Sequence, residues 1–255
     1  MATPEFKRRM LAGEILAGTF QKTPAHEVVE VLAKSGLDFV CLDAEHAPFD
    51  HGRLDVCLAM ARALGLPALV RVPTGSPMEI LKALDGGATG VVVPHVDSVE
   101  KARRVARAAH FGEGGRGFAG STRWAGFATQ GMQAVLDQDR DTVVIAQIEE
   151  PAGVEACEEI AALEAIDGLF VGPADLSVCY GTTDQSSDIV REAMARVGRA
   201  AAAHGKAFMT FAPNADAGPA LRALGVTMFF VASEHGFMLQ GARATANALH
   251  GMEGG

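Results

Sequence analysis

Ionisable side chains follow several short apolar runs of this sequence. Glu149 comes directly after the run 143–148, and Asp175 follows the run 168–171 by four residues. Two carboxylates at the ends of adjacent strands, with no CxxC motif or paired histidines nearby, make a hard oxygen site that suits Mg²⁺ or Mn²⁺. Taken singly, Glu149 could instead face a helix N-terminus, and Asp175 could cap a helix. Gln147, two residues before Glu149 on the same strand face, favours the metal site.

The tetrapeptide Gly172-Pro173-Ala174-Asp175 carries a second signal. Gly172 permits close backbone approach, and a helix that begins near Leu176 offers free N–H groups to a carboxylate or phosphate. A plain tight turn is the alternative, because such a tetrapeptide forms one in any case.

Arg71 and His46 follow two earlier apolar runs. A buried strand rarely carries an arginine without an anionic partner, so Arg71 indicates either a structural carboxylate or a substrate anion. His46 is a candidate general base, because an ordinary histidine titrates near neutrality. Asp43 or Asp85 could orient its ring.

The elements that must position these residues alternate along the whole chain of 255 residues. Short, nearly continuous apolar runs, typical of strands buried on both faces, are separated by helical segments. Eight such units at this length predict a single-domain α/β fold over residues 1–255, a closed (β/α)₈ TIM barrel, with the chemistry at the carboxyl ends of the strands. The predicted strands are Leu16–Phe20, Phe39–Leu42, Ala68–Val72, Gly90–Val93, Val143–Ile148, Gly168–Val171, Ala207–Phe211 and Met228–Ala232.

Helix ends can be read at several places. Thr23 before Pro24 predicts an N-cap, and the sequences from Ser76 and from Asp97 each match a capping box. The segment 110–140 shows no clean strand–helix unit, and a long excursion at a barrel rim is more often functional than filler. The last helix, 236–250, carries an apolar stripe for its own barrel or for a neighbouring subunit.

Composition excludes several function classes. Hydrophobic residues make up 49% and charged residues 21%, and the net charge of −9 does not steer the chain toward nucleic acid. No apolar stretch is long enough to span a membrane, and the N-terminal residues do not resemble a signal peptide, so we expect a cytoplasmic protein. None of the six lysines is expected inside the barrel at a strand's carboxyl end, which argues against a Schiff base.

Five motifs together resemble one family. They occur in order, cover most of the chain, and are similar to the HpcH/HpaI aldolase/citrate lyase family, more closely to its metal-dependent (class II) pyruvate aldolase branch. The motifs are Leu42-Asp43-Ala44-Glu45-His46-Ala47-Pro48, Val70-Arg71-Val72-Pro73, Arg116-Gly117-Phe118, Gln147-Ile148-Glu149 and Gly172-Pro173-Ala174-Asp175-Leu176-Ser177.

The resemblance implies a (β/α)₈ barrel, commonly hexameric, whose last helix packs on a neighbouring subunit. It implies a divalent metal ion, Mg²⁺ or Mn²⁺ and also Co²⁺, on Glu149 and Asp175. The remaining implied roles are pyruvate binding by Gln147 and by the backbone of Gly172 and Ala174, contact of Arg71 with the keto oxygen, proton transfer by His46 paired with Asp85, and support of the site by Asp43.

Three positions depart from the family pattern. His95 replaces an apolar residue after Pro94, Arg123 lies in a segment that is only loosely similar, and His235 follows an unusually polar strand end. We expect Arg123 or His235 to contact a polar or carboxylated aldehyde, with a subunit contact as the alternative for Arg123.

These observations predict an aldolase that cleaves a 4-hydroxy-2-oxo acid to pyruvate and an aldehyde through the pyruvate enolate. The alternatives are a CoA-ester lyase of the citrate lyase β or malyl-CoA type, an oxaloacetate decarboxylase, and a non-catalytic protein that binds 2-oxo acids. A CoA-ester lyase needs a site, often basic, for the long CoA tail, and this sequence offers no obvious one. The presence of His46 argues against a protein that only binds 2-oxo acids, because binding does not require a base.

Overall fold

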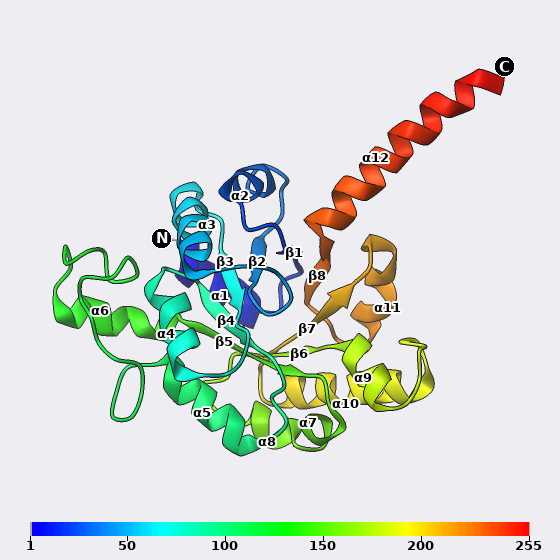
Figure 1. Cartoon of the computed structure of the whole chain (residues 1–255). Helices are drawn as coiled ribbons and strands as arrows, with labels where there is room; N and C mark the ends of the chain where they lie inside the picture. The colour runs from blue at the N-terminus through cyan, green and yellow to red at the C-terminus, as the bar shows by residue number, and fades with distance from the viewer. Residues whose placement is uncertain (1, 255) are drawn as a thin grey trace.

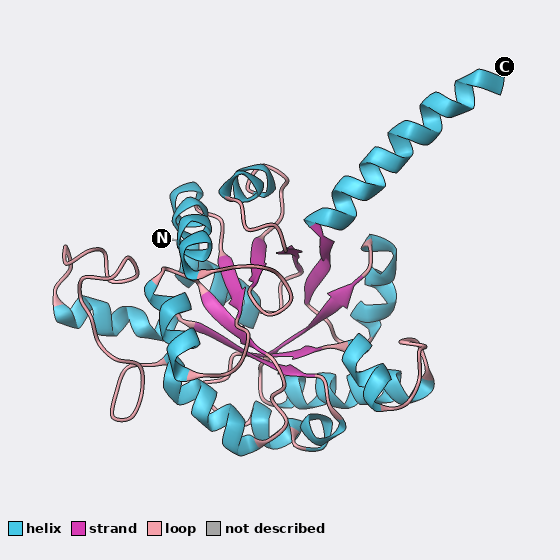
Figure 2. Ribbon diagram, in the orientation of Figure 1, coloured by secondary structure: helices cyan, strands magenta, loops and turns pink. Residues whose placement is uncertain are grey.

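Eight parallel strands close into a barrel in the computed structural model, which describes residues 2–254, with side chains from 4 to 252 (Figures 1 and 2). Every strand pairs with its neighbours in the chain, and β1 also pairs with β8, so the sheet has no free edge. The (β/α)₈ prediction is therefore confirmed. The strands are β1 (Leu16–Gln21), β2 (Phe39–Asp43), β3 (Ala68–Arg71), β4 (Gly90–Val93), β5 (Val143–Ile148), β6 (Gly168–Val171), β7 (Ala207–Ala212) and β8 (Met228–Ser233).

Helices surround the barrel in the order that the sequence pattern predicts. Their bounds are α1 (Ala2–Leu11), α2 (His26–Leu32), α3 (His51–Leu64), α4 (Pro77–Asp85), α5 (Val99–Ala109), α6 (Met132–Gln138), α7 (Pro151–Glu155), α8 (Cys157–Ala161), α9 (Pro173–Cys179), α10 (Asp188–Ala203), α11 (Gly218–Ala223) and α12 (Glu234–His250), with short 3₁₀ turns at Asp139–Asp141, Ala215–Ala217 and Gly251–Gly254.

The barrel interior is filled by aromatic side chains. The rings of Phe39 and Phe230 lie 4.9 Å apart, and Phe6 of α1 packs 5.7 Å from Phe39. Gly18 makes room for this layer, because a Cβ there would come within 2.4 Å of the Phe39 ring. Helix α1 thus covers the amino-terminal end of the barrel with apolar contacts, and the opposite end is left for polar side chains.

Helix N-termini follow the predicted capping chemistry with two corrections. Ser76 accepts a hydrogen bond from the Glu79 N–H as predicted, whereas the cap of α5 is Ser98, one residue later than the predicted Asp97. The Thr23 cap is wrong: α2 begins at His26, and the Thr23 N–H donates to the Glu234 carboxylate instead. A tertiary contact therefore fixes Thr23, which the local sequence had assigned to the start of the helix.

The excursion between β4 and β5 folds onto the outside of the barrel and contains the short helix α6 (Figure 1). Its anchor is Arg116, whose fully buried side chain lies 4.8 Å from the Phe111 ring centre and 4.6 Å from that of Trp124. Arg116 also donates to Asp85 at 2.5 Å, at the end of α4. The anchor fixes the segment to the wall of the barrel.

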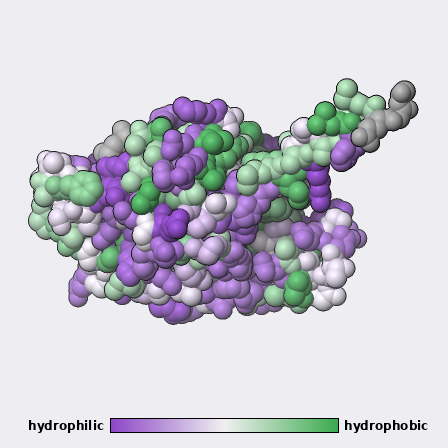
Figure 3. All heavy atoms as spheres, turned by 45° about the horizontal axis from the view of Figure 1, so that its top comes forward, coloured by the Kyte–Doolittle hydropathy of each residue, from purple (hydrophilic) through white to green (hydrophobic). Residues whose placement is uncertain are grey.

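Helix α12 points away from the barrel (Figure 1), and much of its surface belongs to residues coloured as hydrophobic (Figure 3). Phe237, Met238, Leu239 and Leu249 are all exposed. The root of the helix is nevertheless fixed, because buried Glu234 accepts the backbone N–H groups of Lys22 and Thr23. No helix within residues 2–254 has the length and apolar character needed to cross a bilayer.

Candidate active site

A cavity of about 450 Å³ opens at the carboxyl ends of the strands, which is a size that suits a small-molecule ligand. Its wall combines the aromatic rings of Phe20, Phe170 and Phe211 with polar groups from several strand ends. The polar or ionisable lining residues are Lys22, Arg71, Gln147, Asp175, Gln185 and Ser233, and the backbone around Gly172 and Ala174 completes the wall.

Arg71 is held rigidly in the wall of this cavity. Its Nε and Nη2 atoms donate to the two carboxylate oxygens of Asp43 at 2.9 and 2.8 Å, which is the fork geometry of a strong charged pair. The guanidinium also stacks on Phe20, 4.5 Å from the ring centre. Asp43 is fully buried and accepts from Lys22 Nζ at 2.9 Å as well. The anionic partner predicted for Arg71 is thus a structural carboxylate, and the guanidinium still faces the cavity.

Burial alone would raise the pKa of Asp43. The hydrogen bonds and charge of Arg71 and the hydrogen bond from Lys22 outweigh that effect and lower the pKa to about 2. Asp43 therefore stays ionised across the physiological pH range and keeps Arg71 oriented.

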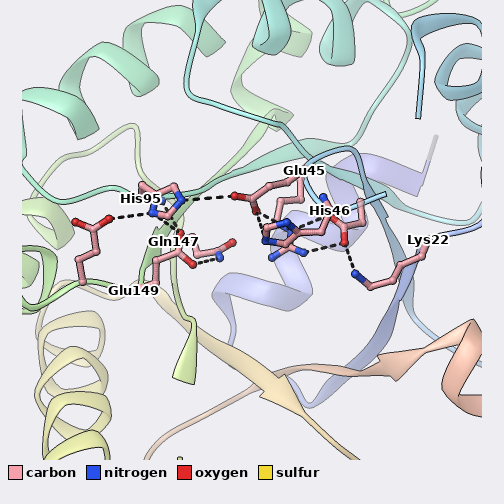
Figure 4. A network of polar contacts seen from close by, with 9 residues as sticks. Lys22, Glu45, His46, His95, Gln147 and Glu149 are labelled. Atoms are coloured by element: carbon pink, nitrogen blue, oxygen red, sulfur yellow. Dashed lines mark hydrogen bonds and ion pairs between the residues drawn. The ribbon is translucent and has the colours of Figure 1, made fainter. Parts of the chain in front are cut away.

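Glu45 links this pair to the other half of the site (Figure 4). Its Oε2 lies 3.3 Å from Arg71 Nε and 3.7 Å from His46 Nε2, and its Oε1 lies 3.7 Å from His95 Nε2. Burial raises the pKa of Glu45 above its ordinary value. His46 stands at the rim with most of its ring exposed, and its backbone N–H donates to Asp43.

Glu149 is buried beneath the cavity and is bound on both oxygens. The Gln147 side chain donates to Oε2, and the His95 backbone N–H donates to Oε1 at 2.7 Å. A Cβ at Gly172 would lie 3.0 Å from Glu149 Oε2 and 3.5 Å from Asp175 Oδ2, so both predicted ligands border the same small space. Gly172 keeps that space open because it has no side chain.

Two predicted contacts, those of Asp85 and Arg123, are not found within the described part of this chain. Among the described residues Asp85 pairs with Arg116, which occupies its carboxylate on the outer wall, and the carboxylate beside His46 is Glu45. The structure therefore gives Asp85 another partner within the single chain, and its pairing with His46 stays a prediction. Arg123 does not line the cavity either: its guanidinium pairs with Asp55 at 2.7 Å and lies over Phe127.

Sequence reasoning missed Lys22, gave Glu45 no role of its own, and placed His95 at a strand end near the mouth without assigning it a role. Lys22 follows β1 directly and lines the cavity, contrary to the expectation that no lysine does so. Its ammonium group is paired with Asp43, whereas a Schiff-base lysine needs a free amine. Position alone would have identified Lys22, because it follows a strand. Glu45 and His95 also follow strands, but their contacts with each other depend on tertiary structure.

His235 lies at the rim beside the cavity. Its Nε2 is 2.8 Å from Thr23 Oγ1, and more than half of its side chain is exposed. Ser233 and Gly236 on either side of it line the cavity. The expectation that His235 contacts the aldehyde stays a prediction.

Comparison with known proteins gives consistent results. The family profile described as HpcH/HpaI aldolase/citrate lyase matches residues 16–240. A hydroxypyruvate/pyruvate aldolase of Paraburkholderia phytofirmans is 32% identical over 97% of this chain and 96% of its own. A 5-keto-4-deoxy-D-glucarate aldolase of Salmonella arizonae is 33% identical over 96% of both chains.

A solved structure has the same architecture. The crystal structure of an HpcH/HpaI aldolase/citrate lyase family protein from Burkholderia cenocepacia superposes with a TM-score of 0.91 at 32% identity. The match covers 96% of this chain and 99% of that one, so the barrel and its excursions correspond almost throughout.

Proposed function

Because the chain belongs to the HpcH/HpaI aldolase/citrate lyase family and is a lyase of the aldolase type, we propose that it cleaves a 4-hydroxy-2-oxo acid to pyruvate and an aldehyde. The reaction passes through the enolate of pyruvate. The observation that carries this proposal is the cavity in which Arg71, Gln147 and Asp175 meet above buried Glu149. A fixed cation and two carboxylates at one small cavity suit a reaction that develops negative charge on an oxygen.

We assign a divalent cation, Mg²⁺ or Mn²⁺ with Co²⁺ as a third candidate, to Glu149 and Asp175. The residues fit such an ion: the donors are hard oxygens, Gly172 leaves space between them, and Gln147 Oε1 is buried without a hydrogen-bond partner in the described part of the chain. When bound there, the cation supplies Lewis acidity to the oxygens of a 2-oxo acid. Gln147 and the backbone of Gly172 and Ala174 hold the pyruvate half.

Arg71 stabilises the developing negative charge on the keto oxygen. Its guanidinium cannot turn away, because Asp43 holds it by two hydrogen bonds and Phe20 lies against its face. A donor that is already oriented needs no reorganisation when charge develops, which is why such groups contribute strongly to catalysis.

His46 moves the proton of the substrate hydroxyl in cleavage, and we infer that the same base takes the proton of the pyruvate methyl group when pyruvate is enolised. It is the base at the rim, and its Nε2 lies 3.7 Å from Glu45 Oε2. A general base of this kind accounts for roughly a hundredfold to ten-thousandfold in rate.

The aldehyde half occupies the rim side of the cavity, where Lys22, Gln185 and Ser233 offer polar contacts. By their names, the relatives act on hydroxypyruvate or on a keto-deoxy sugar acid. We therefore propose a hydroxylated or carboxylated aldehyde as the second product, with His235 next to its polar end.

The assembly that fits this chain is a homo-oligomer joined by α12. An apolar groove of about 390 Å³ lies between α11 and strands β1 and β8, bordered by Ile15, Pro219 and Phe229. This chain's own last helix leaves the groove open, and a second copy supplies a helix with the matching apolar stripe.

The test is proton exchange of the pyruvate methyl group in D₂O, followed by NMR with Mg²⁺ and with EDTA. We expect exchange that needs the metal, falls at least about a hundredfold in His46→Ala, and is lost in Asp175→Asn. His204→Ala, at the opposite end of the barrel, is the matched control and leaves the rate unchanged.

Other outcomes would point elsewhere. Exchange that persists in EDTA and disappears in Lys22→Ala would replace the metal mechanism by lysine chemistry. Absence of exchange with metal present would contradict the pyruvate enolate, and turnover of a CoA thioester or of oxaloacetate would then identify the reaction.

A further inference from the structure

Three residues outside the cavity wall come together beside it. Glu45 follows β2, His95 follows β4 and Glu149 follows β5, so three strand ends each deliver one side chain to the same place (Figure 4). One ligand atom from each lies within 4.8 Å of the others. Two carboxylates and an imidazole at such spacing form a mixed oxygen and nitrogen set, which transition metals prefer.

This group is distinct from the pair Glu149 and Asp175. Glu149 presents its two oxygens in different directions: Oε1 lies 3.3 Å from His95 Nδ1, and Oε2 faces Gln147 and the space at Gly172 shared with Asp175. One carboxylate therefore borders two neighbouring positions.

The imidazole of His95 is oriented as a ligand would be. Its Nδ1 lies 2.9 Å from Glu150 Oε1, and a carboxylate acceptor there places the ring proton on Nδ1. The lone pair is then on Nε2, which faces Glu45 Oε1 at 3.7 Å. Metal-bound histidines usually donate their other N–H to a carboxylate in this way.

Glu45 provides a second, independent sign of a ligand. Only 9% of its side chain is exposed, and its Oε2 is buried without a hydrogen-bond partner among the described residues. A buried carboxylate oxygen is normally satisfied by a donor or a metal ion. The nearest side-chain nitrogen atoms, on Arg71 and on the rings of His46 and His95, lie 3.3 Å or more from its oxygens.

We propose that Glu45, His95 and Glu149 form a second cation position, selective for imidazole-binding ions such as Zn²⁺ or Co²⁺ over Mg²⁺. Binding draws the three side chains together and uses the Nε2 lone pair of His95 with one oxygen from each glutamate. This site does not depend on the proposed aldol reaction, since it is defined by metal binding alone.

The experiment is calorimetric titration of the full chain with Zn²⁺ in the presence of saturating Mg²⁺. We expect one Zn²⁺ per chain, bound at least about a hundredfold more weakly in His95→Asn and in Glu45→Gln. Asparagine suits position 95 because the backbone there has a φ of +54°, which asparagine tolerates well. Glu150→Gln, which replaces the charged acceptor of the ring proton by a neutral amide oxygen, weakens binding about ten- to a hundredfold.

A second readout identifies the nitrogen ligand directly. Cu²⁺ bound at the site shows imidazole nitrogen coupling in pulsed EPR, and the coupling disappears in His95→Asn but persists in His204→Ala. Circular dichroism confirms that each variant is folded.

The outcomes separate the two metal positions. Unchanged Zn²⁺ binding in both His95→Asn and Glu45→Gln, or bound Cu²⁺ without nitrogen coupling, would overturn the second position. Loss of the Zn²⁺ site in Asp175→Asn would also overturn it, because a single shared position would then explain both. Mg²⁺ binding that survives in Asp175→Asn would instead count against the metal ligands assigned under the proposed function.

Discussion

Asp43 is not part of the cavity wall, but it holds three neighbouring groups of the site in place. One buried carboxylate accepts from Arg71, from Lys22 and from the backbone of His46. It neutralises two cations and places the proposed base, so its ionised state is required for the arrangement of all three. Its pKa of about 2, against an ordinary value of 3.8, also makes it a source of folding stability.

Asp43→Asn should therefore lower the free energy of unfolding at pH 7 by about 3 kcal/mol, because it leaves Arg71 buried without its counter-charge. A lowered native pKa contributes stability that is present above pH 4 and lost as the pH falls from about 4 toward 2. The difference between wild type and variant should consequently be constant from pH 7 to pH 4 and shrink below it. Urea unfolding at a series of pH values measures this difference. A constant difference down to pH 2.5 would contradict the lowered pKa.

Most residues of the candidate site could be predicted from the polar residue types at strand ends, because parallel strands bring their carboxyl ends to one face. Arg71, Gln147, Glu149 and Asp175 all lie at or beneath the cavity for that reason. What the sequence could not provide is which charged groups pair. The family resemblance assigned Asp85 to His46, but within this chain Asp85 pairs with Arg116, whose position depends on the fold of the excursion.

At the scale of elements, the eight strands were predicted to within one residue at each end because continuous apolar runs bounded by glycine or polar residues have few other interpretations. The excursion 110–140 could not be predicted in the same way. Its structure depends on Arg116, which lies against the rings of both Phe111 and Trp124, a set of contacts without sequence periodicity.

Arg116→Ala should release this excursion while the barrel stays folded. The change removes a buried guanidinium from two aromatic faces and one carboxylate, at a cost of about 3 kcal/mol in local stability. Hydrogen–deuterium exchange should rise across residues 111–131 and stay unchanged in β1 to β8. Arg104→Ala on the exposed face of α5 serves as the control and should leave both regions protected. Equal protection in the two variants would show that Arg116 does not hold the excursion.

At the scale of the whole molecule, α12 and the groove beside α11 are two halves of one proposed interface. Four large apolar side chains on α12 are exposed in the single chain, and the groove has an almost wholly apolar wall. Burying each such side chain contributes about 1.5–3 kcal/mol, enough together for a stable association.

A chain that ends at residue 236 keeps the Glu234 anchor and lacks the apolar stripe. It should elute as a monomer in size-exclusion chromatography with light scattering, while the full chain elutes as an oligomer, a hexamer by the family resemblance. A chain that ends at residue 250 is the matched control and should assemble like the full chain. An unchanged assembly in the shorter chain would place the interface elsewhere.

The root of α12 has a further consequence for how copies of the chain join. An arm that leaves one molecule and inserts in the next is a head-to-tail contact, which closes into a ring only if each step turns by the right angle and otherwise grows into a filament. In the proposed assembly this angle would depend on the root of α12, where Glu234 accepts the Lys22 and Thr23 N–H groups. Those few hydrogen bonds would then help to decide between a finite ring and an open-ended filament.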